Sequence, residues 1–64
     1  VGGGRKMKTK GGKDFTISGS EWKNGTLIVD YWINGSYQFY RFIGYSKKRA
    51  YALLREKARE GGLD

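Results

Sequence analysis

Apolar and polar residues alternate along the middle of the chain, and two Asn-Gly pairs divide this stretch into three segments. The pairs are Asn24-Gly25 and Asn34-Gly35, and Asn-Gly supplies the two positive-φ residues of a two-residue type I′ hairpin turn. The segments Phe15–Lys23, Thr26–Ile33 and Ser36–Ile43 are rich in β-branched and aromatic residues, as strands usually are. The pattern therefore predicts a three-stranded antiparallel β-meander.

The two turns also determine which side chains share a face of the predicted sheet. A two-residue turn pairs Trp22 with Leu27 in the first hairpin and Ile33 with Ser36 in the second. One face then collects Trp22, Leu27, Val29, Tyr31, Ile33, Tyr40 and Phe42. The other face collects Ile17, Glu21, Lys23, Ile28, Asp30, Trp32, Tyr37, Phe39, Arg41 and Ile43.

Gly19 interrupts the first strand and is a candidate for a β-bulge or a bend. A bulge adds one residue to a strand and so exchanges the faces of all residues before it. The positions of Phe15 and Ile17 therefore stay open at this stage.

A helix is predicted after the sheet, over Lys47–Glu60. Ser46 is a good N-cap, the run that follows has no Gly or Pro, and Gly61-Gly62 supplies a C-terminal stop. A narrow apolar stripe runs along the helix through Ala50, Leu54 and Ala58, flanked by Tyr51 and Leu53. The stripe is expected to pack on the sheet face that has no charged member, which gives an α+β fold of order β-β-β-α. Trp22 lies on that face, and its removal is expected to unfold the domain.

The composition limits the classes of function that the chain can perform. Its 64 residues form one domain and contain neither cysteine nor histidine, which removes disulfides, thiol nucleophiles, His-based acid–base chemistry and the usual metal ligands. No pair of carboxylates has catalytic spacing, and no phosphate-loop motif follows a strand. We expect no enzymatic activity and no cofactor. No apolar run is long enough for a membrane span, and a soluble cytoplasmic protein without a membrane partner is expected.

The net charge of +7 is concentrated in residues 1–13, which carry five basic and no acidic side chains. This segment is rich in Gly and Lys, has little to bury, and is predicted to be a disordered basic arm, with the folded domain over residues 14–64. Two origins of the first six residues stay open. They are a cloning remnant before a native start at Met7, or the chain is an internal domain of a longer protein.

Two further features favour binding of nucleic acid. The sheet face that the helix does not cover carries Trp32, Tyr37, Phe39 and Arg41, with Lys23 at its edge, and contiguous exposed apolar patches mark interaction sites. The run 47–49 places three cations where the first backbone N–H groups of the helix are free, an arrangement suited to phosphate. Each feature also has an alternative interpretation without a binding role. The aromatic face is covered by another part of the protein or by a second subunit, and the three cations are simply solvated at the helix end.

The run from Tyr37 to Ala50 resembles the junction between the third strand and the helix in the N-terminal arm-binding domains of tyrosine recombinases, the phage and transposon integrases. The matching positions are Gly44, Ser46, Lys47, Lys48 and Ala50, and the likeness extends over residues 15–60. In that family the sheet face away from the helix enters the DNA major groove. The resemblance gives this role to Lys23, Ile28, Trp32, Tyr37, Phe39 and Arg41.

The chain also departs from the family pattern. Arg49 stands where an acidic residue is common, Asp30 lies in the middle of the face, and the face is more aromatic than basic. These departures weaken the expectation of base-specific recognition more than the expectation of the fold.

Duplex DNA is the partner that these features favour, with Lys47, Lys48 and Arg49 on phosphates. Two other partners stay open. Single-stranded nucleic acid could stack on the aromatic rings, and a protein partner or a second copy of the chain could cover the aromatic face.

Overall fold

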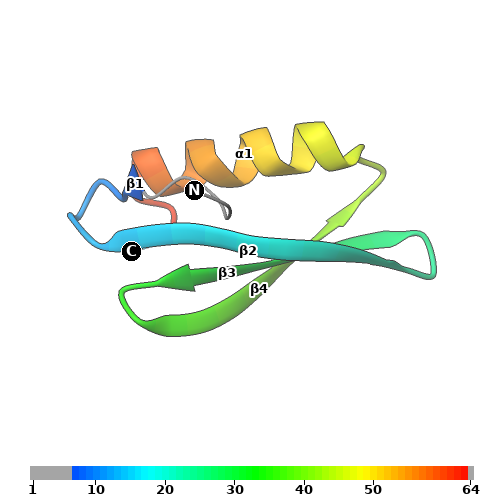
Figure 1. The fold of residues 1–64 in the computed structure, drawn as a ribbon. Helices are drawn as coiled ribbons and strands as arrows, with labels where there is room; N and C mark the ends of the chain where they lie inside the picture. Colours follow the sequence, from blue (N-terminus) through cyan, green and yellow to red (C-terminus); the bar gives the residue numbers. More distant parts are fainter. Residues whose placement is uncertain (1–6, 64) are drawn as a thin grey trace.

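The computed structural model describes residues 7–63 and contains one antiparallel sheet and one helix. The elements are β1 (Met7–Lys8), β2 (Asp14–Lys23), β3 (Thr26–Ile33), β4 (Ser36–Ile43) and α1 (Lys47–Glu60). The strands lie in the order β1-β2-β3-β4. Helix α1 lies across one face of the sheet and leaves the opposite face uncovered (Figure 1). The predicted α+β class and the meander of the last three strands are confirmed.

Both hairpins have the predicted turns and register. Asn24 and Gly25 have φ values of 52° and 79°, and Asn34 and Gly35 have 49° and 84°, as type I′ turns require. Leu27 pairs with both Trp22 and Phe42, as the two turns predict.

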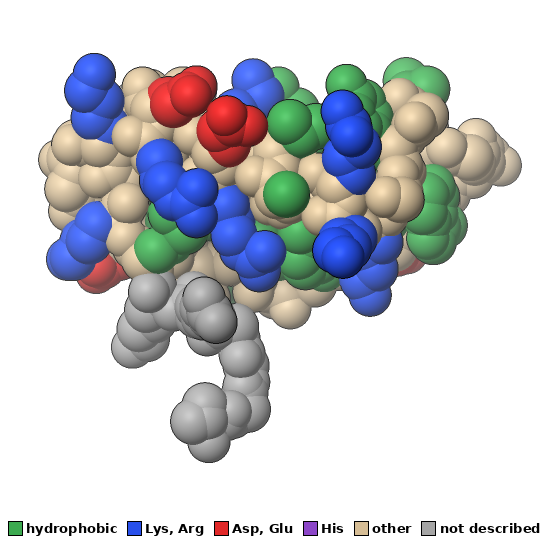
Figure 2. Space-filling view, turned by 90° about the horizontal axis from the view of Figure 1, so that it is seen from above, with side chains coloured by type: hydrophobic (Ala, Val, Ile, Leu, Met, Phe, Trp, Pro, Cys, Tyr) green, Lys and Arg blue, Asp and Glu red, His purple; other side chains and the backbone are tan. Residues whose placement is uncertain are grey.

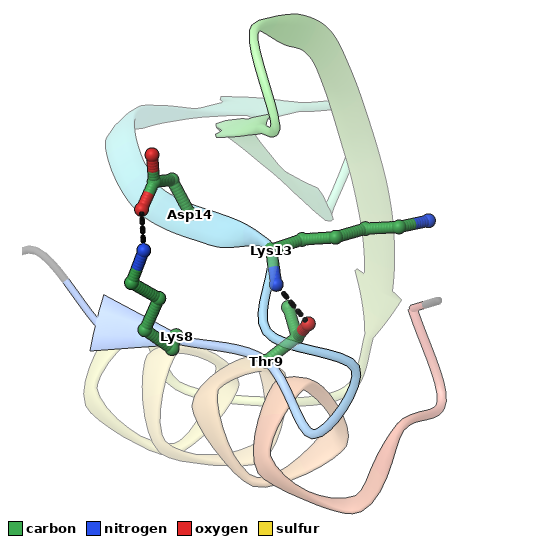
Figure 3. Close-up of polar contacts among 4 residues, drawn as sticks. All are labelled: Lys8, Thr9, Lys13 and Asp14. Atoms are coloured by element: carbon green, nitrogen blue, oxygen red, sulfur yellow. Dashed lines mark hydrogen bonds and ion pairs between the residues drawn. The ribbon is translucent and has the colours of Figure 1, made fainter.

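The sheet has four strands, whereas the sequence predicted three. The additional strand β1 comes from the segment expected to be a disordered arm. Lys8 Nζ lies 2.7 Å from Asp14 Oδ1, and the Lys13 backbone N–H donates to Thr9 Oγ1 at 3.1 Å (Figure 3). The backbone N–H of Lys10 donates to the carbonyl of Ala58 near the end of α1 at 3.0 Å. Residues 7–13 therefore belong to the fold, and residues 1–6 lie outside the described part of the chain.

A β-bulge at Ser18 decides the position that the sequence left open. Ile17 pairs with Tyr31 and Gly19 pairs with Asp30, so Ser18 has no partner on β3. The extra residue turns Phe15 and Ile17 toward α1, where they are 1% and 8% exposed. The assignment of Ile17 to the uncovered face was therefore wrong.

Trp22 is 56% exposed, and the prediction that it is buried was also wrong. Its register and its face are as predicted, because it lies opposite the buried Leu27. The prediction failed because it did not consider which strand lies beside Trp22. Strand β1 pairs only with Asp14 and Phe15, so the second half of β2 is a free edge of the sheet, with no other strand of residues 7–63 beside it.

Helix α1 has the predicted caps and the predicted buried stripe. The Ser46 side chain accepts a hydrogen bond from the backbone N–H of Arg49, and Gly61 ends the helix in the left-handed conformation at φ 85°. The stripe packs on residues from β2, β3 and β4. The resulting core consists of Phe15, Ile17, Leu27, Val29, Tyr31, Ile33, Phe42, Ala50, Leu54 and Ala58.

Candidate nucleic-acid interface

The sheet surface opposite α1, here called the open face, consists of four rows of residues paired across β2, β3 and β4. From the β2–β3 turn onward the rows are Lys23–Thr26–Ile43, Glu21–Ile28–Arg41, Gly19–Asp30–Phe39 and Thr16–Trp32–Tyr37. The structure thus brings together all six of the sheet residues that were predicted to contact nucleic acid.

Aromatic rings form the most prominent part of the open face. Trp32 and Tyr37 are cross-strand neighbours with ring centroids 5.0 Å apart and planes tilted by 52°. The guanidinium carbon of Arg41 lies 5.6 Å from the centroid of the Phe39 ring. These three rings are each about half exposed. They form a contiguous apolar surface of the kind that binds a partner.

Gly19 leaves a gap in this surface on the β2 side. It shares a row with Asp30 and Phe39, but it contributes no side chain. A Cβ atom added there would have no neighbour within 4 Å. The open face therefore has no side chain at this position of β2.

The centre of the open face is acidic. The Tyr37 hydroxyl donates to Asp30 Oδ2 at 2.7 Å. This hydrogen bond is the main cause that raises the pKa of Tyr37 above its ordinary value of 10.0, followed by desolvation and by the negative charges of Asp30 and Glu21. Phosphate groups are therefore disfavoured at the centre, and the cations that could contact them lie toward the β2–β3 turn, where Lys23 is exposed.

We expect Asp30→Asn to move the pKa of Tyr37 back toward 10.0, since it removes the carboxylate that accepts the bond and repels the phenolate. Because the pKa is raised, the bond is intact below pH 10.0 and is lost as pH rises through the raised pKa. An NMR titration of the tyrosine rings measures the shift. Glu21→Gln is the control, and its effect should be smaller because Glu21 is the weakest of the causes. An unchanged Tyr37 titration in Asp30→Asn would contradict the assignment.

The three cations at the start of α1 lie outside the open face. The helix N-terminus is at the same end of the sheet as the β2–β3 turn, but it belongs to the other layer (Figure 1). Lys47 Nζ lies 5.9 Å from the centroid of the Tyr51 ring, and the guanidinium carbon of Arg49 lies 6.0 Å from that of Tyr45. The first turn of α1 contains no acidic residue, so its positive potential is not offset locally.

Most of the positive charge of the described chain is on the helix side. Figure 2 shows Lys and Arg side chains spread over that side, with few Asp or Glu among them. Helix α1 contributes Lys47, Lys48, Arg49, Arg55, Lys57 and Arg59 against Glu56 and Glu60. On the open face, Lys23 and Arg41 are offset by Glu21 and Asp30. The aromatic surface and the cationic surface are therefore on opposite sides of the domain.

The sequence analysis did not place Thr16 or Thr26 on the open face, and it left Ile43 out of the predicted site. Thr16 lies beside Trp32 only because of the bulge, and the alternation by itself places it on the other face. Ile43 was assigned to the correct face but not to the site, although it is 77% exposed. Its position next to a glycine at the end of β4 was the available signal.

The fold and the open face together define a small α+β domain whose uncovered sheet surface is aromatic. Comparisons of the chain with protein-family models, with curated proteins and with solved structures gave no match. The resemblance to recombinase arm-binding domains therefore stays a prediction. In the part of the chain that the structure describes, no helix is long and apolar enough to span a membrane.

Proposed function

We propose that the protein is a non-enzymatic nucleic-acid-binding domain that contacts duplex DNA through its open face. The observation that carries the proposal is the cluster of half-exposed Trp32, Tyr37 and Phe39 beside Arg41, on a sheet surface that no other element of residues 7–63 covers. Rings and an arginine in one surface supply contact area and hydrogen bonds to base edges.

Phosphate contacts in this arrangement come from the end of the domain where the β2–β3 turn and the helix N-terminus lie. Lys23, Lys47 and Lys48 are exposed there, and the first N–H groups of α1 add to the positive potential. The acidic centre of the open face then favours bases over phosphates, because a phosphate near Asp30 would meet a like charge.

Amide NMR shifts on addition of a short duplex test this proposal. We expect shifts over residues 32–41 and 47–49 that fade as salt is added. If about four phosphates are neutralised, the logarithm of the binding constant should fall against the logarithm of salt concentration with a slope near −3.6. Shifts confined to Arg55 and Arg59 on α1, or an affinity independent of salt, would contradict binding through the open face.

A protein partner is the second candidate, and the charge balance of the open face favours it. Lys23 and Arg41 are matched there by Glu21 and Asp30, and Ile43 adds exposed apolar surface. This candidate predicts no response of residues 32–41 to DNA and no effect of charge reversal at Lys47 and Lys48.

A further inference from the structure

The outer edge of β4 is a long row of backbone groups with no partner in the described structure. Strand β4 is the last in the sheet order, and its pairing with β3 is continuous over Ser36–Ile43 without a bulge. Among residues 7–63, no backbone hydrogen bond from a turn, a loop or the helix reaches these residues. The opposite edge differs, since β1 has only two residues and the free part of β2 carries the bulge at Ser18.

The register with β3 identifies the unpartnered groups. In a two-residue hairpin the pair that flanks the turn, Ile33 and Ser36, is hydrogen-bonded, and hydrogen-bonded pairs then alternate along the strands. The N–H and C=O groups of Tyr37, Phe39, Arg41 and Ile43 therefore point away from β3.

Strand β4 also lacks the features with which edge strands usually avoid pairing. It contains no Pro, no Lys and no bulge, and its only charged side chain is Arg41. Natural edge strands are commonly short, bulged or protected by Lys or Pro. A continuous edge of eight residues is a template for one more strand.

A groove between β4 and α1 runs beside this edge and carries charges of both signs. Its apolar lining includes Tyr40, Phe42, Tyr45 and Leu53, and its charged lining includes Glu56, Lys57 and Glu60. Lys57 Nζ lies 5.5 Å from the centroid of the Tyr40 ring. With Arg41 the groove carries two bases and two acids, so it has no net charge that would repel a second copy across a two-fold interface.

We propose that β4 pairs with β4 of a second copy of this chain, antiparallel and centred on Tyr40. In this register Phe39 lies opposite Arg41 of the second copy, and Tyr37 lies opposite its Ile43. These are the residues whose backbone groups point outward, so each pair exchanges two backbone hydrogen bonds. The contact between Arg41 and Phe39 seen within one chain is repeated between chains.

Neighbouring registers are less favourable. A centre on Arg41 would place two guanidinium groups opposite each other, and like charges in direct cross-strand positions destabilise a sheet. A centre on Phe39 would place Ile43 opposite Gly35 of the second copy and leave it without a side-chain neighbour. The centre on Tyr40 uses the full length of the strand.

The pairing would join the two sheets into one and make the two open faces continuous. The inference stands independently of the proposed function, since it rests on the β4 edge and the groove, and its test contains no nucleic acid. A failure of the proposed β4 pairing can therefore be distinguished from a failure of the proposed nucleic-acid binding.

Sedimentation velocity of the full chain at increasing concentration is the first measurement. We expect the mass to rise from 7.3 kDa toward that of two chains. A mixture of isotope-labelled and unlabelled chains should then show an NOE between the α-protons of Gln38 and Phe42. Within one chain these positions are ~13 Å apart along the strand, so the NOE can arise only between chains.

Cysteine substitution tests the register, because the chain has no cysteine of its own. Tyr40→Cys should form a disulfide-linked pair under mild oxidation, since the two positions face each other at the axis with Cα atoms ~4.5 Å apart, within disulfide range. Gln38→Cys is the matched control on the same strand and face. Its two copies would be four positions out of register, and it should stay unlinked.

If the unsubstituted protein has the mass of a single chain at every concentration, the proposal that a second copy pairs with β4 is wrong. The edge would then be a site for an extended strand of another protein. Equal cross-linking of Tyr40→Cys and Gln38→Cys would overturn the register. Faster cross-linking of Trp32→Cys than of Tyr40→Cys would assign the dimer to the open face and would also overturn the proposal.

Discussion

Phe15→Ala is expected to remove a large part of the folding stability of the domain. Phe15 is 1% exposed, and its ring lies 5.4 Å from that of Tyr31 in the core under α1. Removal of a buried Phe side chain costs ~3–5 kcal/mol, and a chain of this length has a total stability of roughly 3–10 kcal/mol. Urea denaturation followed by circular dichroism measures the loss.

Trp22→Ala is the control for this experiment, because Trp22 is a larger ring on the same strand. It is 56% exposed at the free edge of β2, so its removal should shift the urea midpoint only slightly. The two results together test the bulge at Ser18. Without that bulge Phe15 would point to the open face, and a larger destabilisation by Trp22→Ala than by Phe15→Ala would contradict the structure of β2.

Trp32→Ala is expected to weaken DNA binding about 30-fold or more while leaving the fold intact. Trp32 is 46% exposed in the row with Thr16 and Tyr37, so little core packing is lost. Truncation of a Trp that is a hot spot of an interface commonly costs about 2 kcal/mol or more, which is roughly 30-fold in affinity. Fluorescence anisotropy of a labelled short duplex measures the change.

Trp22→Ala serves again as the matched control, because both tryptophans are about half exposed but lie on opposite faces of the sheet. It should leave the affinity within about twofold, the usual scatter of a surface substitution. Equal losses in the two variants would contradict binding through the open face. A different pattern would assign the target as single-stranded nucleic acid. In that pattern Trp32→Ala weakens binding to single strands more than binding to duplex, and Arg41→Gln retains binding.

The part of the open face on β3 and β4 was predictable because local chemistry determines it. The turn Asn34-Gly35 sets a two-residue loop, and the loop sets the register. Once Ile33 lies opposite Ser36, alternation places Trp32, Tyr37 and Phe39 on one surface. No information from distant residues is needed for this step.

The errors arose where a position depends on residues distant in the sequence. The bulge at Ser18 is stable because it lets Phe15 and Ile17 bury their side chains under a helix that begins thirty residues later. The exposure of Trp22 depends on where β1 ends, and the alternation within β2 contains no information on that.

The segment before β2 is another region whose structure depends on residues distant in the sequence. Gly and Lys give residues 7–13 little to bury, and composition by itself favours disorder. In the structure their backbone is held by β2 and by the carbonyl of Ala58 at the end of α1, and Thr9 is 5% exposed. Backbone hydrogen bonds to a partner that exists only in the folded state leave no trace in the sequence pattern.

The pattern of residues along the chain is enough to predict the two hairpins, their register, the helix with its caps and the composition of the open face on β3 and β4. These features follow from φ preferences, period-two alternation and capping, which act over a few residues. The fourth strand, the inward turn of Phe15 and Ile17, the exposure of Trp22 and the separation of the aromatic face from the cationic helix could be read only from the folded domain. Each of these depends on which surfaces the packed elements cover, and coverage is set by contacts between segments far apart in the chain.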